Sequence, residues 1–394
     1  MSALFKILKG GRVFSPEDTG EKDLLLAGNS IAYIAEKIDP SPVYGEVEVI
    51  DVKGKYVVPG FIDQHVHLIG GGGEAGFASR TPEVMLSRVT RAGITTVVGC
   101  LGTDGTTRHM ASLLAKARGL EAEGLSTYIY TGAYEVPTRT ITDNVRNDII
   151  LIDKVLGCGE IAISDHRSAQ PSKEDIAKLA AEARVGGILS GKAGVLHLHV
   201  GDGRHKLGML FEILEETEIP ISQFTPTHIN RNPYLLEDGI RFAKMGGMID
   251  MTSGVSPGAG ADKSVKASRA IKYCLEQGVA IDRITMSSDG NGSMPLFDEK
   301  GGIQRLLVAE LDSLYTEFKS LILEEKVNLS DALKVITQNP AQSLKLYPRK
   351  GSLQVGGDAD IVVLDQDLNI EYVFARGQCM VKQGQAVVKG NFEK

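Results

Sequence analysis

The chain has 394 residues, which is enough for one large domain with a small satellite, and its formal net charge is −7. This acidic balance, with no cluster of lysines and arginines, argues against a nucleic-acid partner. No run of eighteen apolar residues is present, so we expect no membrane span. The four cysteines lie far apart in the sequence and fit free thiols of a reducing compartment, so we expect a cytoplasmic protein.

Short strand-like runs mark both ends of the chain. Apolar residues alternate with polar ones within the first sixty residues, and Gly, Asn and Pro separate the runs. Similar runs return at 360–364, 371–375 and 378–382. We therefore expect the two ends, residues 1–58 and 346–394, to form one small β-sandwich domain into which the rest of the chain is inserted.

Between these ends, β-rich runs alternate with helical patterns. The predicted strands are 57–67, 95–101, 127–134, 160–164, 195–200, 221–228, 248–253 and 284–288, and the predicted helices are 82–92, 108–123, 172–185, 207–217, 234–244 and 265–277. Ser172 to Asp175 resembles a helix capping box. Eight strands that alternate with helices predict an α/β fold with a catalytic (β/α)8 barrel of the TIM type over 59–345, closed by a helix-rich stretch after Gly302. A doubly wound open sheet is the alternative.

Histidines and acids fall at the ends of the predicted strands. His65 and His67 end the first strand, where a period of two places both imidazoles on one face. A lone His-x-His is a weak signal, because a buried histidine can simply be hydrogen-bonded in the core. Barrel enzymes gather their catalytic groups at the C-terminal ends of several strands, and clustered N and O donors are typical zinc ligands. The further strand-end donors are Glu160, His197, His199, His228 and Asp289.

Several motifs carry a resemblance to a known family. Asp63-x-His-x-His67, together with Asn339-Pro-Ala341 and the following Gly-Asp-Ala-Asp-Ile-Val-Val-Leu364, resembles the amidohydrolase superfamily. The finer pattern is similar to the isoaspartyl dipeptidases, also called β-aspartyl dipeptidases, over nearly the whole chain. Its marks are Gly70-Gly-Gly-Gly-Glu74, Gly132-Ala-Tyr134, Ile163-Ser-Asp-His-Arg167, Thr227-His-Ile-Asn-Arg231 and Ser288-Asp-Gly-Asn-Gly-Ser293.

This resemblance implies a centre with two zinc ions. His65 and His67 would bind the first ion together with Asp289, and His199 and His228 would bind the second. A hydroxide that bridges the ions would attack the amide carbonyl, because metal ions lower the pKa of bound water. Asp289 would take the proton and pass it to the leaving amine as general base and acid.

The resemblance also implies how an isoaspartyl dipeptide is held. Its contacts would be Glu74 with the α-amino group, Arg231 and Ser293 with the α-carboxylate, Arg167 with the carboxylate of the departing residue, Tyr134 with the carbonyl oxygen, and Gly72 and Thr103 as lesser contacts. A zwitterionic dipeptide needs one acid and forked guanidinium groups, so the set is chemically consistent. The competing interpretation places Arg167 and Arg231 in surface salt bridges. Family resemblance further suggests a homo-oligomer, an octamer.

One position departs from the family pattern. Members commonly bridge the two ions with a carbamylated lysine on the fourth strand, and counting back from Ser164 places Glu160 there. A carboxylate has the charge and the two oxygens of a carbamate but is shorter by about 4 Å. Gly157 and Gly159 would permit a bulge or a close approach that compensates. We expect Glu160 to bridge two Zn²⁺ ions, and a single ion with Glu160 as a bystander is the alternative.

Other functions remain open at this point. The glycine-rich run from Gly71 to Gly76 matches a dinucleotide fingerprint literally, but no helical pattern begins there and Glu74 would repel a pyrophosphate. The rivals are another amidohydrolase, either a cyclic amidase such as a dihydropyrimidinase or dihydroorotase or an N-acyl amino acid deacylase, and a metal-free scaffold without activity. Glu74 favours the dipeptidase, because a ring substrate has no free ammonium group to pair with it.

Overall fold

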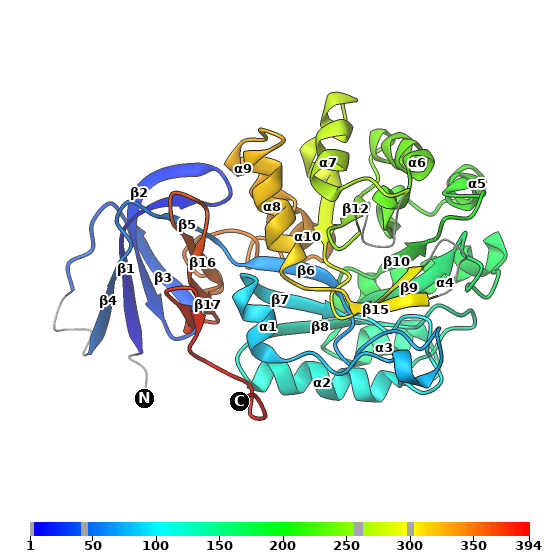
Figure 1. Ribbon diagram of the computed structural model, residues 1–394, viewed down its shortest axis with the longest axis horizontal. Coiled ribbons are helices and arrows are strands. Elements are labelled where there is room, and N and C mark those ends of the chain that lie inside the picture. The colour runs from blue at the N-terminus through cyan, green and yellow to red at the C-terminus, as the bar shows by residue number, and fades with distance from the viewer. Residues whose placement is uncertain (1–3, 41–45, 256–262, 298–302) are drawn as a thin grey trace.

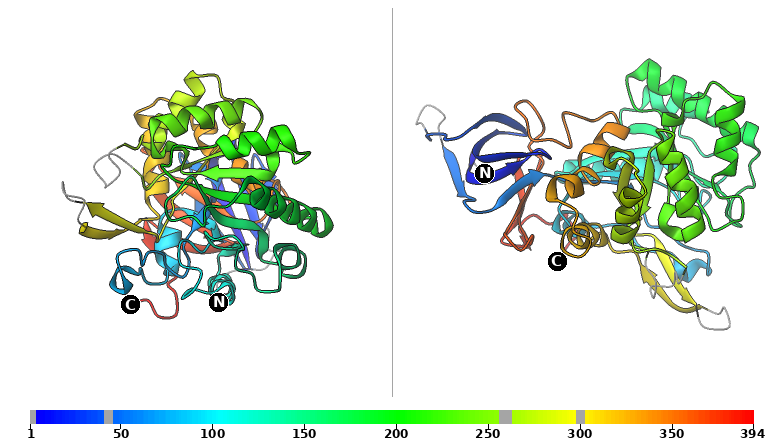
Figure 2. Two further views of the ribbon diagram at one scale, coloured as in Figure 1. Left: turned by 90° about the vertical axis from the view of Figure 1, so that its right-hand side faces the viewer. Right: turned by 90° about the horizontal axis from the view of Figure 1, so that it is seen from above.

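The computed structural model describes residues 4–40, 46–255, 263–297 and 303–394, and it has two parts (Figure 1). A sheet built from strands of the N-terminal and C-terminal parts of the chain stands beside a larger α/β body, whose helices are arranged around its strands (Figure 2). The predicted fold class, a TIM-like barrel with a β region built by both ends of the chain, is confirmed. No helix in these ranges has the length and apolarity needed to cross a lipid bilayer.

The sheet of the chain ends contains nine strands in the order β19-β18-β17-β16-β5-β1-β2-β3, and β4 also pairs with β1. The strands are β1 Phe5–Phe14, β2 Asp18–Ala27, β3 Ser30–Ala35, β4 Val47–Asp51, β5 Tyr56–Pro59, β16 Ile361–Leu364, β17 Ile370–Ala375, β18 Gln378–Lys382 and β19 Gln385–Ala386. The two ends of the chain meet where β16 pairs antiparallel with β5. Their alternating apolar residues, among them Leu24 and Val363, form a core cluster of their own.

Eight parallel strands form the barrel. They are β6 Phe61–Val66, β7 Ile94–Gly99, β8 Ser126–Thr131, β9 Val155–Ile163, β10 Val195–Val200, β11 Phe224–Thr227, β12 Ile249–Thr252 and β13 Ile284–Ser287. Strands β6 to β11 make one continuous sheet, and β12 and β13 make a second parallel pair. Strand β11 lies beside β12, and β13 lies beside β6, so the strands follow one another around a ring.

The seam between β13 and β6 closes this ring. Val66 pairs with Gly290 as an isolated parallel bridge, and the amide of His67 donates to the carbonyl of Gly290 at 2.9 Å. The buried carboxylate of Asp63 accepts hydrogen bonds from the amide of Ser288 at 3.1 Å and from the hydroxyl of the same residue. These bonds hold the C-terminal ends of β6 and β13 side by side.

Helices follow the barrel strands and cover them. They are α1 Leu86–Arg91, α2 Met110–Ala122, α3 Val145–Leu151, α4 Lys173–Ser190, α5 Gly208–Glu216, α6 Pro233–Lys244, α7 Ala267–Glu276, α8 Ser313–Leu323, α9 Leu329–Lys334 and α10 Gln338–Ser343. The capping box of α4 is present, because Ser172 Oγ accepts from the amide of Asp175 at 3.2 Å and the Asp175 carboxylate accepts from the amide of Ser172 at 3.0 Å. Helix α3, which Asn144 caps, was not predicted.

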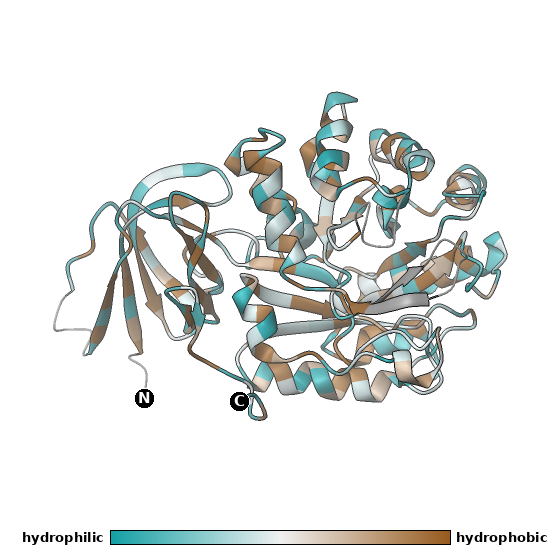
Figure 3. Cartoon of the chain, in the orientation of Figure 1, coloured by the Kyte–Doolittle hydropathy of each residue, from teal (hydrophilic) through white to brown (hydrophobic). Residues whose placement is uncertain are grey.

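Hydrophobic residues are frequent on the strands of both parts (Figure 3). The largest core cluster joins barrel residues such as Ile129 and Leu198 to Val373 and Met380 of the C-terminal strands. The nine-stranded sheet is therefore packed against the barrel through continuous apolar contact.

Several predicted elements have other bounds in the structure; the predicted strand 160–164, for example, is β9 Val155–Ile163. Two differences change the path of the chain. The predicted strand 57–67 divides at Gly60 into β5 and β6, because the chain leaves the end sheet there and enters the barrel; a Cβ on Gly60 would lie 2.2 Å from Thr95 Oγ1. The stretch after Gly302, predicted to be helix-rich, begins with strand β15 Ile303–Val308. This strand pairs antiparallel with β14 Ser293–Phe297 and so forms a hairpin before α8 starts.

Candidate metal centre

The carboxylate of Glu160, on β9, lies among four imidazoles. Its Oε1 is 3.6 Å from Nε2 of His67. Its Oε2 is 3.4 Å from Nε2 of His65, 3.2 Å from Nδ1 of His199 and 3.6 Å from Nε2 of His228. Both oxygens therefore face histidines, and these histidines come from the ends of three different strands.

Asp289, directly after β13, adds a second carboxylate to this cluster. Its Oδ1 lies 3.0 Å from Nε2 of His67 and 3.5 Å from Nε2 of His65. The side chain of Asp289 is 28% exposed, whereas that of Glu160 is 2% exposed, so Asp289 stands on the open side of the cluster. The structure thus brings together all six residues that the sequence analysis named as metal ligands.

The spacing and chemistry of these donors fit metal ions. With Zn–N bonds of about 2.1 Å, ligand atoms around one tetrahedral zinc ion lie about 3.4 Å apart, and the separations here run from 3.0 to 3.6 Å. Nε2 of His65 and Nε2 of His228 are buried and have no hydrogen-bond partner within the described residues. Buried polar atoms are normally satisfied, so a cation is a suitable partner for them.

In three of these histidines, the ring nitrogen that does not face Glu160 contacts another residue, its outer partner. Nδ1 of His65 lies 2.9 Å from Nε2 of His197, Nε2 of His199 lies 2.8 Å from Asp165, and Nδ1 of His228 lies 2.7 Å from the hydroxyl of Thr252. Such partners fix the orientation of metal-binding imidazoles and raise their basicity.

The sequence patterns predict no role for these outer partners. His197 was recognised only as a strand-end histidine, while Asp165 and Thr252 were not singled out. A usable signal existed for Asp165, because it stands in the same Ile163-to-Arg167 motif as a predicted substrate residue. Thr252 ends β12, a position that several predicted ligands occupy on their own strands.

Burial and charge together shift the pKa values of the cluster. Burial alone would raise the pKa of Glu160, but the neighbouring His65, His199 and His228 lower it well below its usual range. Burial lowers the pKa of His228 to about 3, which leaves its imidazole neutral. Burial raises the pKa of Tyr134 well above 10, so its hydroxyl keeps its proton. Glu160 is therefore anionic and His228 neutral, which are the forms that bind cations.

A bulge in β9 presents Glu160 to the histidines. Opposite Leu196 and Leu198 of β10, the paired residues of β9 advance from Cys158 to Ile161, so β9 carries one additional residue at this point. A Cβ on Gly157 would lie 2.4 Å from the carbonyl oxygen of Val195, and one on Gly159 would lie 2.7 Å from that of His197. The close approach expected from the two glycines is therefore present beside Glu160.

The residues predicted to bind substrate meet at the rim of the same cluster. Thr103 donates to Oε1 of Glu74 at 2.8 Å, and Nη1 of Arg167 lies 3.4 Å from that oxygen. Arg167 also makes a bidentate contact with Asp165, with Nε 3.0 Å from Oδ1 and Nη2 2.8 Å from Oδ2. Because Asp165 contacts His199, a continuous chain of polar contacts connects the rim to the metal centre.

The remaining predicted residues lie at this mouth as well. The hydroxyl of Tyr134 is 2.8 Å from Nδ1 of His199. A Cβ on Gly72 would lie 2.5 Å from Cβ of Ser293, so the glycine loop and Ser293 are in close contact. Nε of Arg231, three residues after His228, is buried without a hydrogen-bond partner among the residues described. That guanidinium can therefore donate to a ligand.

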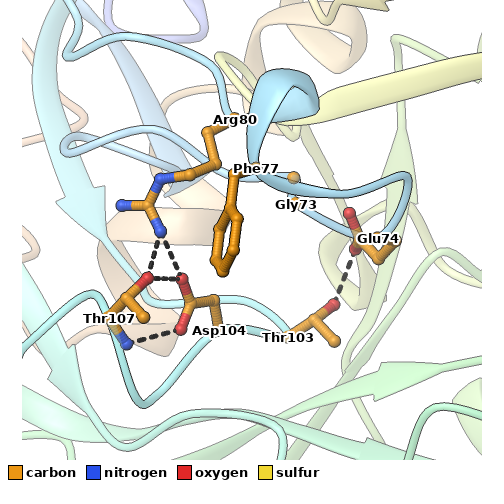
Figure 4. Close-up of a pocket in the computed structure, with 8 residues that line it drawn as sticks. Gly73, Glu74, Phe77, Arg80, Thr103, Asp104 and Thr107 are labelled. Atoms are coloured by element: carbon orange, nitrogen blue, oxygen red, sulfur yellow. Dashed lines mark hydrogen bonds and ion pairs between the residues drawn. The ribbon is translucent and has the colours of Figure 1, made fainter.

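An open pocket adjoins Glu74. It is lined by Gly72, Gly73, Glu74, Phe77, Arg80, Thr103, Asp104 and Thr107. Figure 4 shows Thr103 directed at Glu74 on one side and Arg80 directed at Asp104 and Thr107 on the other. Phe77, of the short 3-10 helix η2 Phe77–Ser79, lies between them. The pocket gives solvent and small molecules access to Glu74.

Comparison with known proteins identifies the family of this site. Residues 56–390 match the model of the amidohydrolase family. The chain belongs to the amidohydrolase family. The β-aspartyl dipeptidase of Fervidobacterium islandicum AW-1 is 44% identical to this amidohydrolase in two solved structures, one of them in complex with a β-Asp-Leu dipeptide. The TM-score is 0.89, and the match covers 99% of this chain and 99% to 100% of that one. This likeness confirms the resemblance to the β-aspartyl dipeptidases and identifies the chain as a hydrolase acting on peptide bonds.

More distant relatives share the fold of this amidohydrolase or part of its sequence. The dihydropyrimidinase of Brevibacillus agri NCHU1002 is 17% identical, with a TM-score of 0.68 and coverage of 98% and 96% of the two chains, which shows the common fold alone. A dihydroorotase of Staphylococcus aureus is 40% identical over 92 residues. That match spans 23% of this chain and 20% of the dihydroorotase, well under two thirds of the curated relative.

Proposed function

We propose that this amidohydrolase is a zinc dipeptidase that hydrolyses the β-aspartyl amide bond of isoaspartyl dipeptides. One observation carries the proposal: the carboxylate of Glu74 and the guanidinium of Arg167 stand 3.4 Å apart at the rim of a donor cluster that fits metal ions. An isoaspartyl dipeptide presents an ammonium group and carboxylates, so it complements such a pair of opposite charges. The likeness to a dipeptidase solved with β-Asp-Leu supports the same choice.

The proposed metal ligands divide into two sets that share Glu160. His65, His67 and Asp289 would hold one zinc ion, and His199 and His228 would hold the other. When bound, the ions supply Lewis acidity and a water molecule of lowered pKa. Two contacts support direct bridging by Glu160 without a carbamylated lysine: Oε1 faces His67 while Oε2 faces His199.

The rim residues would orient the dipeptide. Glu74 binds the free α-amino group, Arg231 and Ser293 bind the α-carboxylate, and Arg167 binds the carboxylate of the departing residue. Guanidinium groups pair with carboxylates through two parallel hydrogen bonds, and the unsatisfied Nε of Arg231 is available for one of them. In this proposed binding mode, the β-aspartyl carbonyl would lie over the metal centre.

Asp289 and Tyr134 would handle the proton and the developing charge. Burial would raise the pKa of Asp289, but the hydrogen bond to His67 and the nearby His65 and His228 lower it below the usual range, so the carboxylate is ionised at neutral pH. It can then take a proton from the attacking water and pass it to the leaving nitrogen. Tyr134 keeps its hydroxyl proton and can donate it in a hydrogen bond to the carbonyl oxygen. Its present partner, Nδ1 of His199, also faces Glu160, so metal binding there would release the hydroxyl.

A comparison of three substrates tests the proposal. Purified protein should hydrolyse β-Asp-Leu and leave dihydrouracil and an N-acetyl amino acid untouched, and Glu74→Gln should raise KM for β-Asp-Leu because the ammonium group loses its counter-ion. Faster turnover of dihydrouracil would assign a cyclic amidase instead, and faster turnover of the N-acetyl amino acid would assign a deacylase. A chain without bound metal and without turnover of any of the three would be a scaffold.

Direct bridging has a test of its own. Metal-free protein should regain full activity when zinc is added in buffer purged of CO2, because Glu160 needs no modification. A requirement for bicarbonate would contradict bridging by Glu160.

A further inference from the structure

A thiol reaches the same centre from a strand that contributes none of the proposed ligands. Cys100 directly follows β7 and is completely buried. Its Sγ lies 3.8 Å from the carbonyl oxygen of Val66 and 4.0 Å from Nδ1 of His67, the other ring nitrogen than the Nε2 that faces Glu160 and Asp289. His65, His67, Cys100 and Glu160 each offer one ligand atom, and these four atoms all lie within 4.8 Å of one another.

The chemistry of sulfur favours metal binding over hydrogen bonding in this position. A thiol is a weak hydrogen-bond donor and acceptor, so a contact of 4.0 Å to an imidazole contributes little by itself. A thiolate, by contrast, is one of the strongest zinc ligands. Nitrogen and sulfur atoms on one tetrahedral zinc ion lie about 3.6 Å apart, so ligand atoms that now lie within 4.8 Å of one another would have to move closer when an ion binds.

Two further observations point to the same site. Nε2 of His65 is buried and has no hydrogen-bond partner within the described chain, and His65 belongs to the metal-capable group that contains Cys100. The other three cysteines, Cys158, Cys274 and Cys379, belong to none of the metal-capable groups found in the described residues. Burial raises the pKa of Cys158, which suits an inert core thiol.

We propose that Cys100 is a sulfur ligand of the metal position served by His65, His67 and Glu160. This inference rests on the proposed metal centre and makes it a mixed N, O and S site. The S–H bond is replaced by a sulfur–metal bond, and the proton leaves to solvent. A site with a thiolate prefers thiophilic ions such as Zn²⁺ and Cd²⁺ over Mg²⁺ and Mn²⁺.

Cadmium reconstitution of the full chain tests the assignment. The Cd²⁺-loaded protein should show a thiolate-to-metal charge-transfer band in the ultraviolet, and Cys100→Ser should abolish it. The matched control is Cys158→Ser, which removes another buried thiol from the barrel and should keep the band. Cys100→Ser should also weaken zinc binding at one of the two positions by about 10-fold to 100-fold or more.

X-ray absorption on the zinc-loaded parent protein provides a measurement that needs no variant. A sulfur neighbour at about 2.3 Å from zinc would support the proposal even if Cys100→Ser fails to fold. Bound zinc with only nitrogen and oxygen neighbours, or a cadmium band that survives Cys100→Ser, would overturn it while leaving the proposed dipeptidase intact. A parent protein that binds no metal would overturn both.

Discussion

A single carboxylate, that of Glu160, faces four imidazoles, so its removal should affect both proposed metal positions at once. The variant Glu160→Gln keeps the shape of the side chain but loses its charge. We expect the zinc content to fall below two per chain and kcat/KM for β-Asp-Leu to fall by at least about 100-fold. The exposed Glu182→Gln on α4 serves as the control and should keep full zinc and activity. Unchanged zinc in Glu160→Gln would show that Glu160 is a bystander.

Asp165 links two parts of the site, because one oxygen contacts His199 and both contact Arg167. We expect Asp165→Asn to lower kcat by about 10-fold to 100-fold through a misoriented imidazole. KM should rise as well, because the guanidinium group of Arg167 loses the carboxylate that holds it in position. Steady-state kinetics combined with zinc analysis separate the two effects. A change in KM alone would mean that His199 does not depend on Asp165.

At the scale of residues, the proposed metal ligands could be predicted from the sequence. The residues that orient those ligands through hydrogen bonds could not. His65, His67, Glu160, His199, His228 and Asp289 could be named because the family resemblance selects them among the strand-end imidazoles and acids. Position alone would have included His197 as well. Thr252 and Asp165 act through a hydrogen bond to a histidine, and such a bond depends on how two different strands face each other. The sequence of one strand does not contain that information.

At the scale of elements, the bulge in β9 sets the position of Glu160. Gly157→Ala would place a Cβ 2.4 Å from the carbonyl oxygen of Val195, a backbone atom that cannot move aside easily. We expect this variant to lose about 1 to 3 kcal/mol in the free energy of unfolding, measured by denaturant titration. Gly119→Ala on α2 is the control, because nothing lies within 4 Å of its added Cβ and alanine favours a helix by up to about 1 kcal/mol. Equal stability of the two variants would contradict a tight contact at Gly157.

The elements themselves were predictable where periodicity alone decides them. Strand β10 begins and ends where the sequence predicts, at Val195 and Val200, because Gly194 and Gly201 bound a short run in which apolar residues and histidines alternate. The division of the predicted strand 57–67 was missed, since the apolar pattern continues through Gly60 although the chain changes sheet there. The hairpin of β14 and β15 was missed because its stability depends on pairing between two segments.

At the scale of the whole molecule, a buried lysine links the C-terminal segment to the barrel. Nζ of Lys350 lies 2.7 Å from Asp358, 2.5 Å from Asp360 and 2.7 Å from the hydroxyl of Ser126. Ser126 is the first residue of β8, so this contact lies at the end of the barrel opposite the metal centre. It therefore contributes to stability without taking part in catalysis.

We expect Lys350→Ala to lower the free energy of unfolding by about 3 kcal/mol or more, because the buried carboxylate of Asp360 loses its counter-charge while Asp358 keeps only Arg349. Its kcat/KM should stay close to that of the parent protein. Burial lowers the pKa of Lys350, but the charges of Asp360 and Asp358 outweigh it and leave it raised. The stabilisation is therefore present at neutral pH and is lost as the pH rises through the folded pKa.

The control for Lys350→Ala is Arg349→Ala, which removes a 69% exposed partner of the same Asp358 and should cost less than about 1 kcal/mol. Urea titrations of both variants at two pH values measure the difference. Similar losses for the two variants would show that burial adds nothing to the ion pair.

The ring of barrel strands is closed where β13 meets β6, and proposed metal ligands stand on both sides of that seam. His65 is 224 residues away from Asp289, so no local segment can assemble the centre early in folding. Zinc binding should therefore occur late in refolding, after the ring of barrel strands has closed. In stopped-flow refolding with a fluorescent zinc indicator, we expect uptake to follow the main rise in helical signal. Uptake that precedes this signal would mean that a partial barrel already gathers the ligands.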